Sequence, residues 1–469
     1  MPAHPLEPDR AEMAAMATAA ADLVASFVEG LPAAPAAPPA GGGTGPPLAD
    51  LLRPPPERPG DLAALLAEFA AAAAPAIETA GPGYLAYVGG GGLYSSALAE
   101  FVARAFNRYS GFAAFAPGLV ALEDSTLRWL VGEFGLPATG AGLLTTGGSM
   151  ATLTALVAAR VDRLGDDFGV GTVYVTEFTH RCLAKAARVA GLRADQIRVV
   201  PTDADLRMDP EAAAAMIESD RAAGHRPFLL AGTAGTTHTG TVDPLPELAA
   251  VARAAGLWFH VDAAYGGFFH LTERGRTRLA GIGAADSIVL GPHKGLFLPH
   301  GTGVLLVRDG ATLRHAYAAD GHYLQDLAGG DDLPDYADLG PELTRDYRGL
   351  RLWLPLHLHG VGAFRAALDE KLDLAAFAHA ELAATPGLEV PWAPDLSIVA
   401  FRLPGGSAAD DANRALLARV NGGGRVHLSS TLVGGAVTLR LCIIVHRTHH
   451  DRVAEAVDAI RREAPARGD

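Results

Sequence analysis

The segment SIVLGPHKG places His293 and Lys294 directly after an apolar run that is typical of a buried strand. A lysine at a strand end can form a Schiff base with a carbonyl group, although a single lysine there is more often a surface residue. Asp262 follows a second such run, in LWFHVDAAYGG. Its carboxylate is expected to be poorly solvated, so it would pair either with a cationic ligand nitrogen or with a structural hydrogen-bond network.

A third segment, TTGGSMATLTAL from Thr145, places Gly148 and Ser149 at the start of a helical pattern. Backbone amides and a hydroxyl at a helix N-terminus can bind a phosphate. Taken alone, such a turn more often begins a plain capped helix, and it is not a Walker loop because no Gly-Lys-Ser/Thr follows.

Together, the three segments contain the groups that pyridoxal phosphate requires. This cofactor needs an anion site for its phosphate, a carboxylate for its pyridine nitrogen and an amine for its aldehyde. The turn at Gly148, the carboxylate of Asp262 and the amine of Lys294 could supply them in that order. The combination favours a pyridoxal-phosphate site over three unrelated structural features.

The elements that must position these groups alternate along the middle of the chain. Runs typical of strands begin at residues 171, 197, 227, 257, 287 and 303, and helical patterns cover 149–163, 181–190, 209–223 and 245–255. This alternation predicts an α/β fold with a mostly parallel sheet, in which ligands bind beyond the carboxyl ends of the strands.

The chain divides into three expected parts. Residues 1–80 predict an N-terminal helical arm and a linker rich in proline and glycine, because an alanine-rich helix ending at Gly30 precedes LPAAPAAPPAGGGTGPP. Residues 81–370 form the expected large domain. Residues 371–469, with strand candidates at LSIVAFRL and AVTLRLCII, form the expected small C-terminal α+β domain.

Composition limits the partners of the protein. The 469 residues include 38 basic and 52 acidic side chains, and the formal charge of −14 provides no attraction to nucleic acid or to an anionic membrane. A small-molecule ligand is therefore the default expectation. Cys182 and Cys442 are the only cysteines, so we expect two ordinary thiols, no metal site and a reducing compartment.

The N-terminus and the apolar segments indicate a cytoplasmic protein. The opening MPAHPLEPDR has acids and prolines before any apolar run, unlike a secretory signal. The most apolar stretch, LAALLAEFAAAAAPAI from Leu62, is interrupted by Glu68 and Pro75 and is shorter than the about 20 residues that span a bilayer. We therefore expect no membrane span.

The sequence also resembles the group II pyridoxal-phosphate decarboxylases, typified by aromatic L-amino acid decarboxylase and glutamate decarboxylase. The resemblance runs from about Tyr84 to the C-terminus and rests on TTGGSMATLTAL, GTAGTTHTGTVDPL, AGLWFHVDAAYGG, ADSIVLGPHKG and DYADLGPELTRDYRGLRLW. It implies the aspartate-aminotransferase-like fold (fold type I), an amino acid as substrate and a homodimer with shared active sites at the interface.

The resemblance implies a role for each matching residue. Lys294 would form the Schiff base with the cofactor, and Asp262 would pair with its protonated pyridine nitrogen. His180, without the resemblance an ordinary strand-end histidine, would stack on one face of the ring, and the methyl group of Ala264 would lie against the other. Thr236 would lie beside the ring oxygen. The residues implied to hold the phosphate are Gly148, Ser149 and Ser287, and His293 is a further implied cofactor contact.

Tyr336 matches the tyrosine that protonates the α-carbon in these decarboxylases, on a loop that would cross the dimer interface to the partner's cofactor. It lies in a region rich in Gly and Asp, typical of a mobile loop, where a tyrosine is otherwise an amphipathic surface residue. Arg440 matches an arginine that grips the substrate carboxylate in some relatives, and a structural ion pair is the alternative. Tyr87 and Val88 would line the substrate pocket.

The expected reaction is the decarboxylation of an L-amino acid to the amine and carbon dioxide. An aromatic or large apolar side chain is preferred because no dedicated cation for an acidic side chain is evident, although Val88 and Gly89 stand where aromatic decarboxylases carry larger groups. One rival is oxidative deamination to an aldehyde, against which Tyr336 argues. Others are a carbon-carbon lyase of the sphingosine-phosphate-lyase type, which LPHGTGVLLVR also resembles, and a cofactor-binding regulator without turnover.

Overall fold

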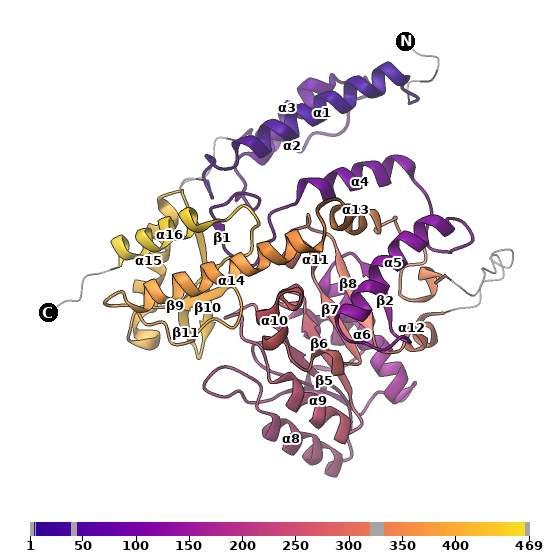
Figure 1. Ribbon diagram of the computed structural model, residues 1–469, viewed down its shortest axis with the longest axis vertical. Coiled ribbons are helices and arrows are strands. Elements are labelled where there is room, and N and C mark those ends of the chain that lie inside the picture. The colour runs from indigo at the N-terminus through magenta and orange to yellow at the C-terminus, as the bar shows by residue number, and fades with distance from the viewer. Residues whose placement is uncertain (1–3, 5, 39–44, 319–332, 465–469) are drawn as a thin grey trace.

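A computed structural model describes residues 4, 6–38, 45–318 and 333–464. An N-terminal helical arm projects from the body at the top of Figure 1, a large α/β domain forms the lower right, and the C-terminal part of the chain forms a smaller domain on the left. The α/β fold with a mostly parallel sheet is therefore confirmed.

Within the described residues, the large domain is built on a seven-stranded sheet with the order β2-β8-β7-β6-β5-β3-β4. The strands are β2 (Ala141–Thr145), β3 (Gly171–Val175), β4 (Ile197–Val199), β5 (Arg226–Thr233), β6 (Trp258–Ala263), β7 (Ser287–Leu290) and β8 (Gly303–Val307). β8 runs antiparallel to both of its neighbours, and the remaining pairs are parallel. The apolar runs in the sequence predict every strand of this seven-stranded sheet except β2.

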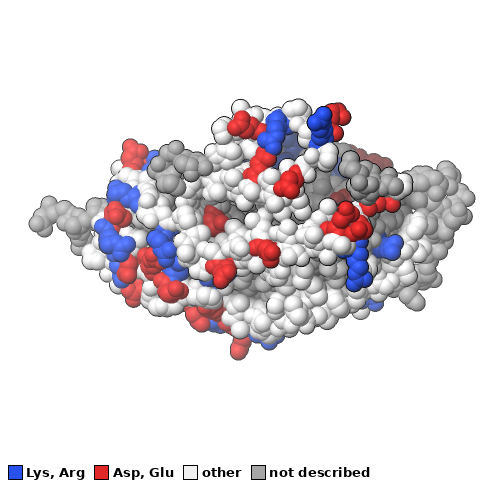
Figure 2. Space-filling model, turned by 90° about the horizontal axis from the view of Figure 1, so that it is seen from above, with Lys and Arg blue, Asp and Glu red and all other residues white. Residues whose placement is uncertain are grey.

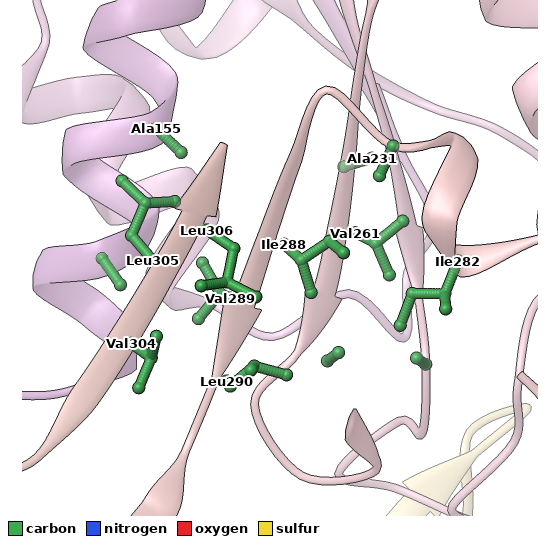
Figure 3. Close-up of a cluster of buried hydrophobic side chains, with 14 of the residues drawn as sticks. Ala155, Ala231, Val261, Ile282, Ile288, Val289, Leu290, Val304, Leu305 and Leu306 are labelled. Carbon is green, nitrogen blue, oxygen red and sulfur yellow. The ribbon is translucent and has the colours of Figure 1, made fainter. Parts of the chain in front are cut away.

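The sheet forms because its central strands are almost uninterrupted runs of apolar residues, as expected when helices cover both faces. Figure 3 shows Val261 of β6, Ile288 of β7 and Leu306 of β8 packed side by side in this core, with Ala155 of the neighbouring helix α6 close to β8. The helices of this domain are α4 (Tyr94–Phe106), α5 (Pro117–Glu133), α6 (Gly148–Leu164), α7 (Cys182–Val189), α8 (Pro210–Ala222), α9 (Leu245–Ala254), α10 (Glu273–Arg278), α11 (Pro292–Gly295), α12 (Gly310–Tyr317) and α13 (Leu350–His359).

The smaller domain has a four-stranded sheet in the order β1-β10-β11-β9 within the described part of the chain. Its elements are β1 (Tyr84–Leu85), β9 (Ile398–Phe401), β10 (His427–Val433), β11 (Ala436–Cys442), α14 (Val361–Ala383), α15 (Asp410–Gly422) and α16 (His450–Glu463). β1 falls in the range expected for the large domain, yet it pairs in parallel with β10. α14 runs continuously through the expected boundary at residue 370.

The arm comprises α1 (Arg10–Gly30), α2 (Leu48–Leu51) and α3 (Leu62–Ala73), in which no residue is buried. Asp61 caps α3 by accepting a hydrogen bond from the Ala64 N–H. α1 is long and apolar enough to cross a membrane by length and composition alone, although the sequence predicts no membrane span. Signal sequences and core helices share these properties, so the helix by itself assigns no membrane role.

Charged side chains are dispersed over the face shown in Figure 2. Among the described residues visible there, basic and acidic side chains are interspersed and separated by wide uncharged areas. This face therefore presents no continuous basic surface.

Candidate active site

The carboxyl ends of β3, β5, β6 and β7 meet at one edge of the large sheet because these strands are parallel. A cavity of 410 Å³ lies at this edge. It is lined by Tyr87, Val88, Thr146, Gly147, Gly148, Ser149, Met150, Thr152, His180, Cys182, Thr233, Gly235, Thr237, Asp262, Ala264, Tyr265, His293, Lys294 and His300. The structure thus brings together nine of the residues singled out from the sequence: Tyr87, Val88, Gly148, Ser149, His180, Asp262, Ala264, His293 and Lys294.

Lys294 lies in the short helix α11, directly after β7. Burial lowers the pKa of its amine below the ordinary value, against the opposing charge of Asp262. A lowered pKa raises the fraction of the neutral, nucleophilic amine at pH 7. Gly291 allows the close packing of this segment, because a Cβ at this position would lie 2.5 Å from the carbonyl oxygen of Ala264.

Asp262 is the next-to-last residue of β6 and is 6% exposed. Its Oδ1 accepts a hydrogen bond from the Ala264 N–H at 3.1 Å. The side chains of His180 and Cys182 are close by, and the potential ligand atoms of all three lie within 4.8 Å of one another. Burial raises the pKa of the Cys182 thiol to about 12, so this thiol is protonated at pH 7.

His180 precedes α7, and its Nδ1 accepts a hydrogen bond from the Cys182 N–H at 3.3 Å. The proton of the neutral ring therefore lies on Nε2. Burial lowers the pKa of His180, and the charge of Asp262 acts in the opposite direction. A largely neutral imidazole at pH 7 is therefore expected beside the carboxylate.

The turn before α6 has the features of an anion site. Gly147 has a φ of +152°, and α6 begins at Gly148 with its free backbone N–H groups at the edge of the cavity. The 17-residue helix directs the positive end of its dipole toward the same place. The hydroxyl groups of Thr146 and Ser149 are on the same lining.

These residues fit pyridoxal phosphate. The turn at α6 can hold the phosphate, the buried carboxylate of Asp262 can keep the pyridine nitrogen protonated, and the amine of Lys294 can bind the aldehyde. A carboxylate this poorly exposed, with no ion-pair partner among the described residues, is suited to a cationic ligand atom.

Comparison with known proteins supports this interpretation. Residues 50–404 match the model of the pyridoxal-dependent decarboxylase conserved domain. The chain belongs to this family. It is 35% identical to an aromatic-L-amino-acid decarboxylase of Bacillus atrophaeus, over 81% of this chain and 80% of that protein. It is 30% identical to a phenylacetaldehyde synthase of Arabidopsis thaliana, over 79% of this chain and 80% of that protein.

Solved structures give the same result. The crystal structure of Oryza sativa TDC with PLP and tryptamine superimposes with a TM-score of 0.91 at 26% identity, covering 98% of this chain and 99% of that one. The decarboxylase therefore has fold type I and is a pyridoxal-phosphate-dependent carboxy-lyase, as predicted.

Ser287 does not lie in the cofactor pocket of the decarboxylase. It begins β7, at the opposite end of the strand from Lys294. Its Oγ accepts a hydrogen bond from Trp258 Nε1 at 2.8 Å and lies 2.8 Å from His260 Nδ1. The expectation that Ser287 helps to hold the phosphate is thereby corrected, because the length of the strand separates it from the turn at α6.

Thr237, rather than Thr236, lines the pocket. The hydroxyl of Thr236 lies 3.2 Å from that of Thr239, inside a buried cluster. The motif GTAGTT contains both threonines, and the sequence alone does not reveal which of two adjacent side chains faces the cofactor. The expected contact at Thr236 therefore moves to its neighbour.

Tyr336 is absent from the described lining of the pocket and is 1% exposed. It begins a short 3-10 helix (Tyr336–Asp338), and the Arg345 guanidinium lies 4.6 Å from the centre of its ring. Burial raises the pKa of its phenol well above the ordinary value. A side chain enclosed in its own subunit cannot reach a partner's cofactor, so this placement contradicts the predicted role. Tyr323, a neighbouring tyrosine in the sequence, lies outside the described residues.

Arg440 lies in β11 beside the pocket and is 6% exposed. Its Nη1 donates a hydrogen bond to the Thr237 carbonyl oxygen, and its Nε has no partner in the described structure. It borders a second cavity, of 430 Å³, which shares Tyr87, Val88, His180 and Thr237 with the first. No ion pair of Arg440 with a carboxylate occurs among the described residues, which leaves its predicted role toward a substrate carboxylate open.

Tyr87 and Val88 line both cavities and have left-handed backbone conformations, with φ of 53° and 61°. This conformation is unfavourable for a β-branched residue such as valine. The nearby Gly90 packs closely against the segment of Lys294, since a Cβ at Gly90 would clash with the His293 carbonyl oxygen. The segment is thus held directly against the segment that carries Lys294.

Proposed function

We propose that the protein converts an aromatic L-amino acid to the corresponding amine and carbon dioxide, as a homodimer. One observation carries the proposal. The buried carboxylate of Asp262, the amine of Lys294 and the turn before α6 that can bind a phosphate all line a single cavity. The name of the Bacillus relative, an aromatic-L-amino-acid decarboxylase, supports the substrate class.

Three residues of the site have defined tasks in this reaction: Lys294, Asp262 and Arg440. When bound, pyridoxal phosphate supplies an electron sink for the carbanion that remains at the α-carbon after carbon dioxide leaves. The amine of Lys294 would hold the cofactor by its aldehyde, and Asp262 would hold a proton on the pyridine nitrogen. Orientation decides which bond of the substrate breaks, and we assign to Arg440 the positioning of the substrate carboxylate.

A screen of L-amino acids tests the substrate class. We expect the holoenzyme to release carbon dioxide and amine from tryptophan, tyrosine, phenylalanine or dihydroxyphenylalanine, and Lys294→Ala to release neither. Glutamate and valine serve as acidic and aliphatic comparisons. Release from glutamate or valine alone would refute the aromatic class while leaving the decarboxylase reaction intact.

The homodimer is supported by exposed apolar side chains. Phe27 of α1, Phe69 of α3 and Phe101 of α4 are 49%, 67% and 60% exposed. Tyr87 is 61% exposed although it lines the cofactor cavity, and a second subunit over the mouth would cover it. We expect light scattering to give a dimer and Phe101→Glu to give an inactive monomer. An active monomer would contradict the shared site.

A second candidate is oxidative decarboxylation to an aldehyde, which consumes oxygen and releases ammonia and hydrogen peroxide. The similarity to a phenylacetaldehyde synthase favours it. Tyr336 no longer argues against it, since that side chain lies outside the pocket lining. Measurement of amine, aldehyde and peroxide from the same reaction distinguishes the two, because only the aldehyde route consumes oxygen.

A further inference from the structure

His300 lines the cofactor pocket and has no role in the site described above. It lies between α11 and β8, and its side chain is exposed at the mouth of the pocket. Its ring centre is 5.6 Å from that of His293, and no hydrogen bond or ion pair of His300 occurs among the described residues. A polar side chain at the edge of the pocket is therefore available to a ligand.

The strand register places His300 beside the turn of α6. β2 and β8 are antiparallel, and Thr145 is paired with Gly303. Residues that precede Gly303 therefore lie at the same edge as residues that follow Thr145. The contact is close, because a Cβ at Gly303 would clash with the carbonyl carbon of Gly147.

Two side chains fix the segment that carries His300. The Arg351 guanidinium, which is 7% exposed, donates to the Gly301 carbonyl oxygen at 3.1 Å and to the Thr302 hydroxyl at 3.3 Å. His293 Nδ1 donates to the Thr302 carbonyl oxygen at 2.7 Å. Gly301 has a φ of +102°, a conformation that favours glycine. The position of His300 is thus determined by the protein and not by a free loop.

The pocket has few cations for a phosphate. Its described lining contains no arginine, and Lys294 is taken up by the aldehyde. Burial lowers the pKa of His293 to about 4, so this neighbour is neutral at pH 7. His180 lies beside Asp262, the residue expected at the pyridine nitrogen. His300 is the remaining basic side chain of the described lining.

We propose that His300 donates a hydrogen bond to the phosphate group of the cofactor and helps the protein to retain the phosphorylated form. The ligand chemistry is a phosphate monoester, held by the backbone N–H groups of α6 on one side and by an imidazole on the other. His300 is then a binding residue, and the bond-breaking steps do not depend on it.

The test compares two forms of the cofactor on the apoenzyme. Dissociation constants for pyridoxal phosphate and for pyridoxal, which lacks the phosphate, are measured by absorbance for wild type and His300→Ala. We expect about a tenfold weaker binding of pyridoxal phosphate, the size of one charge-assisted hydrogen bond, and a change of less than about twofold for pyridoxal. His300→Lys should restore most of the affinity for pyridoxal phosphate. His450→Ala, in α16 of the smaller domain, should change neither constant.

A second measurement uses inorganic phosphate as the probe. Inorganic phosphate should compete with pyridoxal phosphate for the wild-type apoenzyme and compete less well for His300→Ala. Equal weakening of both cofactor forms would place His300 at the ring or make its role structural. Unchanged binding of pyridoxal phosphate with a raised KM for the amino acid would make it a substrate contact. Either result overturns the proposal but leaves the decarboxylase reaction in place.

Discussion

Replacement of Asp262 by asparagine removes the charge of the site and preserves its shape. The amide oxygen of asparagine can still accept the hydrogen bond that Oδ1 now receives from the Ala264 N–H. The volume of the side chain changes little, so β6 and its pairing with β7 should remain intact. The substitution therefore isolates the electrostatic contribution of the carboxylate to the pyridine nitrogen.

The burial of Asp262 sets the size of the effect. The side chain is 6% exposed, so an effective dielectric constant of about 20 is more suitable than that of water. Two opposite charges at about 4 Å then attract each other by about 4 kcal/mol. If the carboxylate and the protonated pyridine nitrogen attract each other this strongly in the transition state, removal of the carboxylate charge lowers kcat by about a thousandfold.

The assay measures carbon dioxide release and cofactor content of the same preparations. Asp262→Asn should retain bound cofactor, through Lys294 and the turn of α6, and lose about a thousandfold in kcat. Asp243→Asn is the matched control, because Asp243 is also buried and accepts the Thr233 N–H, but is absent from the described lining of the pocket. A kcat of Asp262→Asn within about tenfold of wild type would refute the electrostatic role.

Three further predictions follow from placements that only the structure shows. Tyr336→Phe should leave kcat and the ratio of amine to aldehyde unchanged, since the hydroxyl of Tyr336 has no partner in the described structure. Tyr323→Phe is measured beside it. A loss of amine in Tyr336→Phe alone would show that Tyr336 is the proton donor after all. Thr237→Val should weaken binding of pyridoxal phosphate, whereas Thr236→Val should mainly lower the melting temperature, and the reverse pattern would show that the side chains are interchanged. His293 has a folded-state pKa of about 4 against about 6.5 when unfolded, so its contribution to stability is present above pH 6.5 and is lost as the pH falls toward 4. We expect the free energy of unfolding of the apoenzyme, measured in urea, to fall between pH 7 and pH 5. The fall should be about 2 kcal/mol smaller in His293→Gln than in wild type, and an equal fall in both would contradict this.

Local patterns predicted most elements of the large domain closely. The helix expected at 149–163 is observed at Gly148–Leu164, and the strand expected to begin at residue 287 does begin there. These predictions succeed because apolar periodicity and capping residues act within a few residues of the chain. β1 was not predicted, because two residues carry no periodicity and their partner strand lies more than 340 positions away.

Residue types and their spacing along the chain were enough to predict the chemistry of the site. Lys294, Asp262 and the turn at Gly148 each follow a recognisable strand or precede a recognisable helix, and parallel strands bring such positions to one edge. Tertiary structure decided which neighbouring side chains face the cofactor. Thr237 replaces Thr236, and Tyr336 is enclosed under Arg345, because the direction of a side chain depends on packing against residues far away in the chain, which local sequence patterns do not encode.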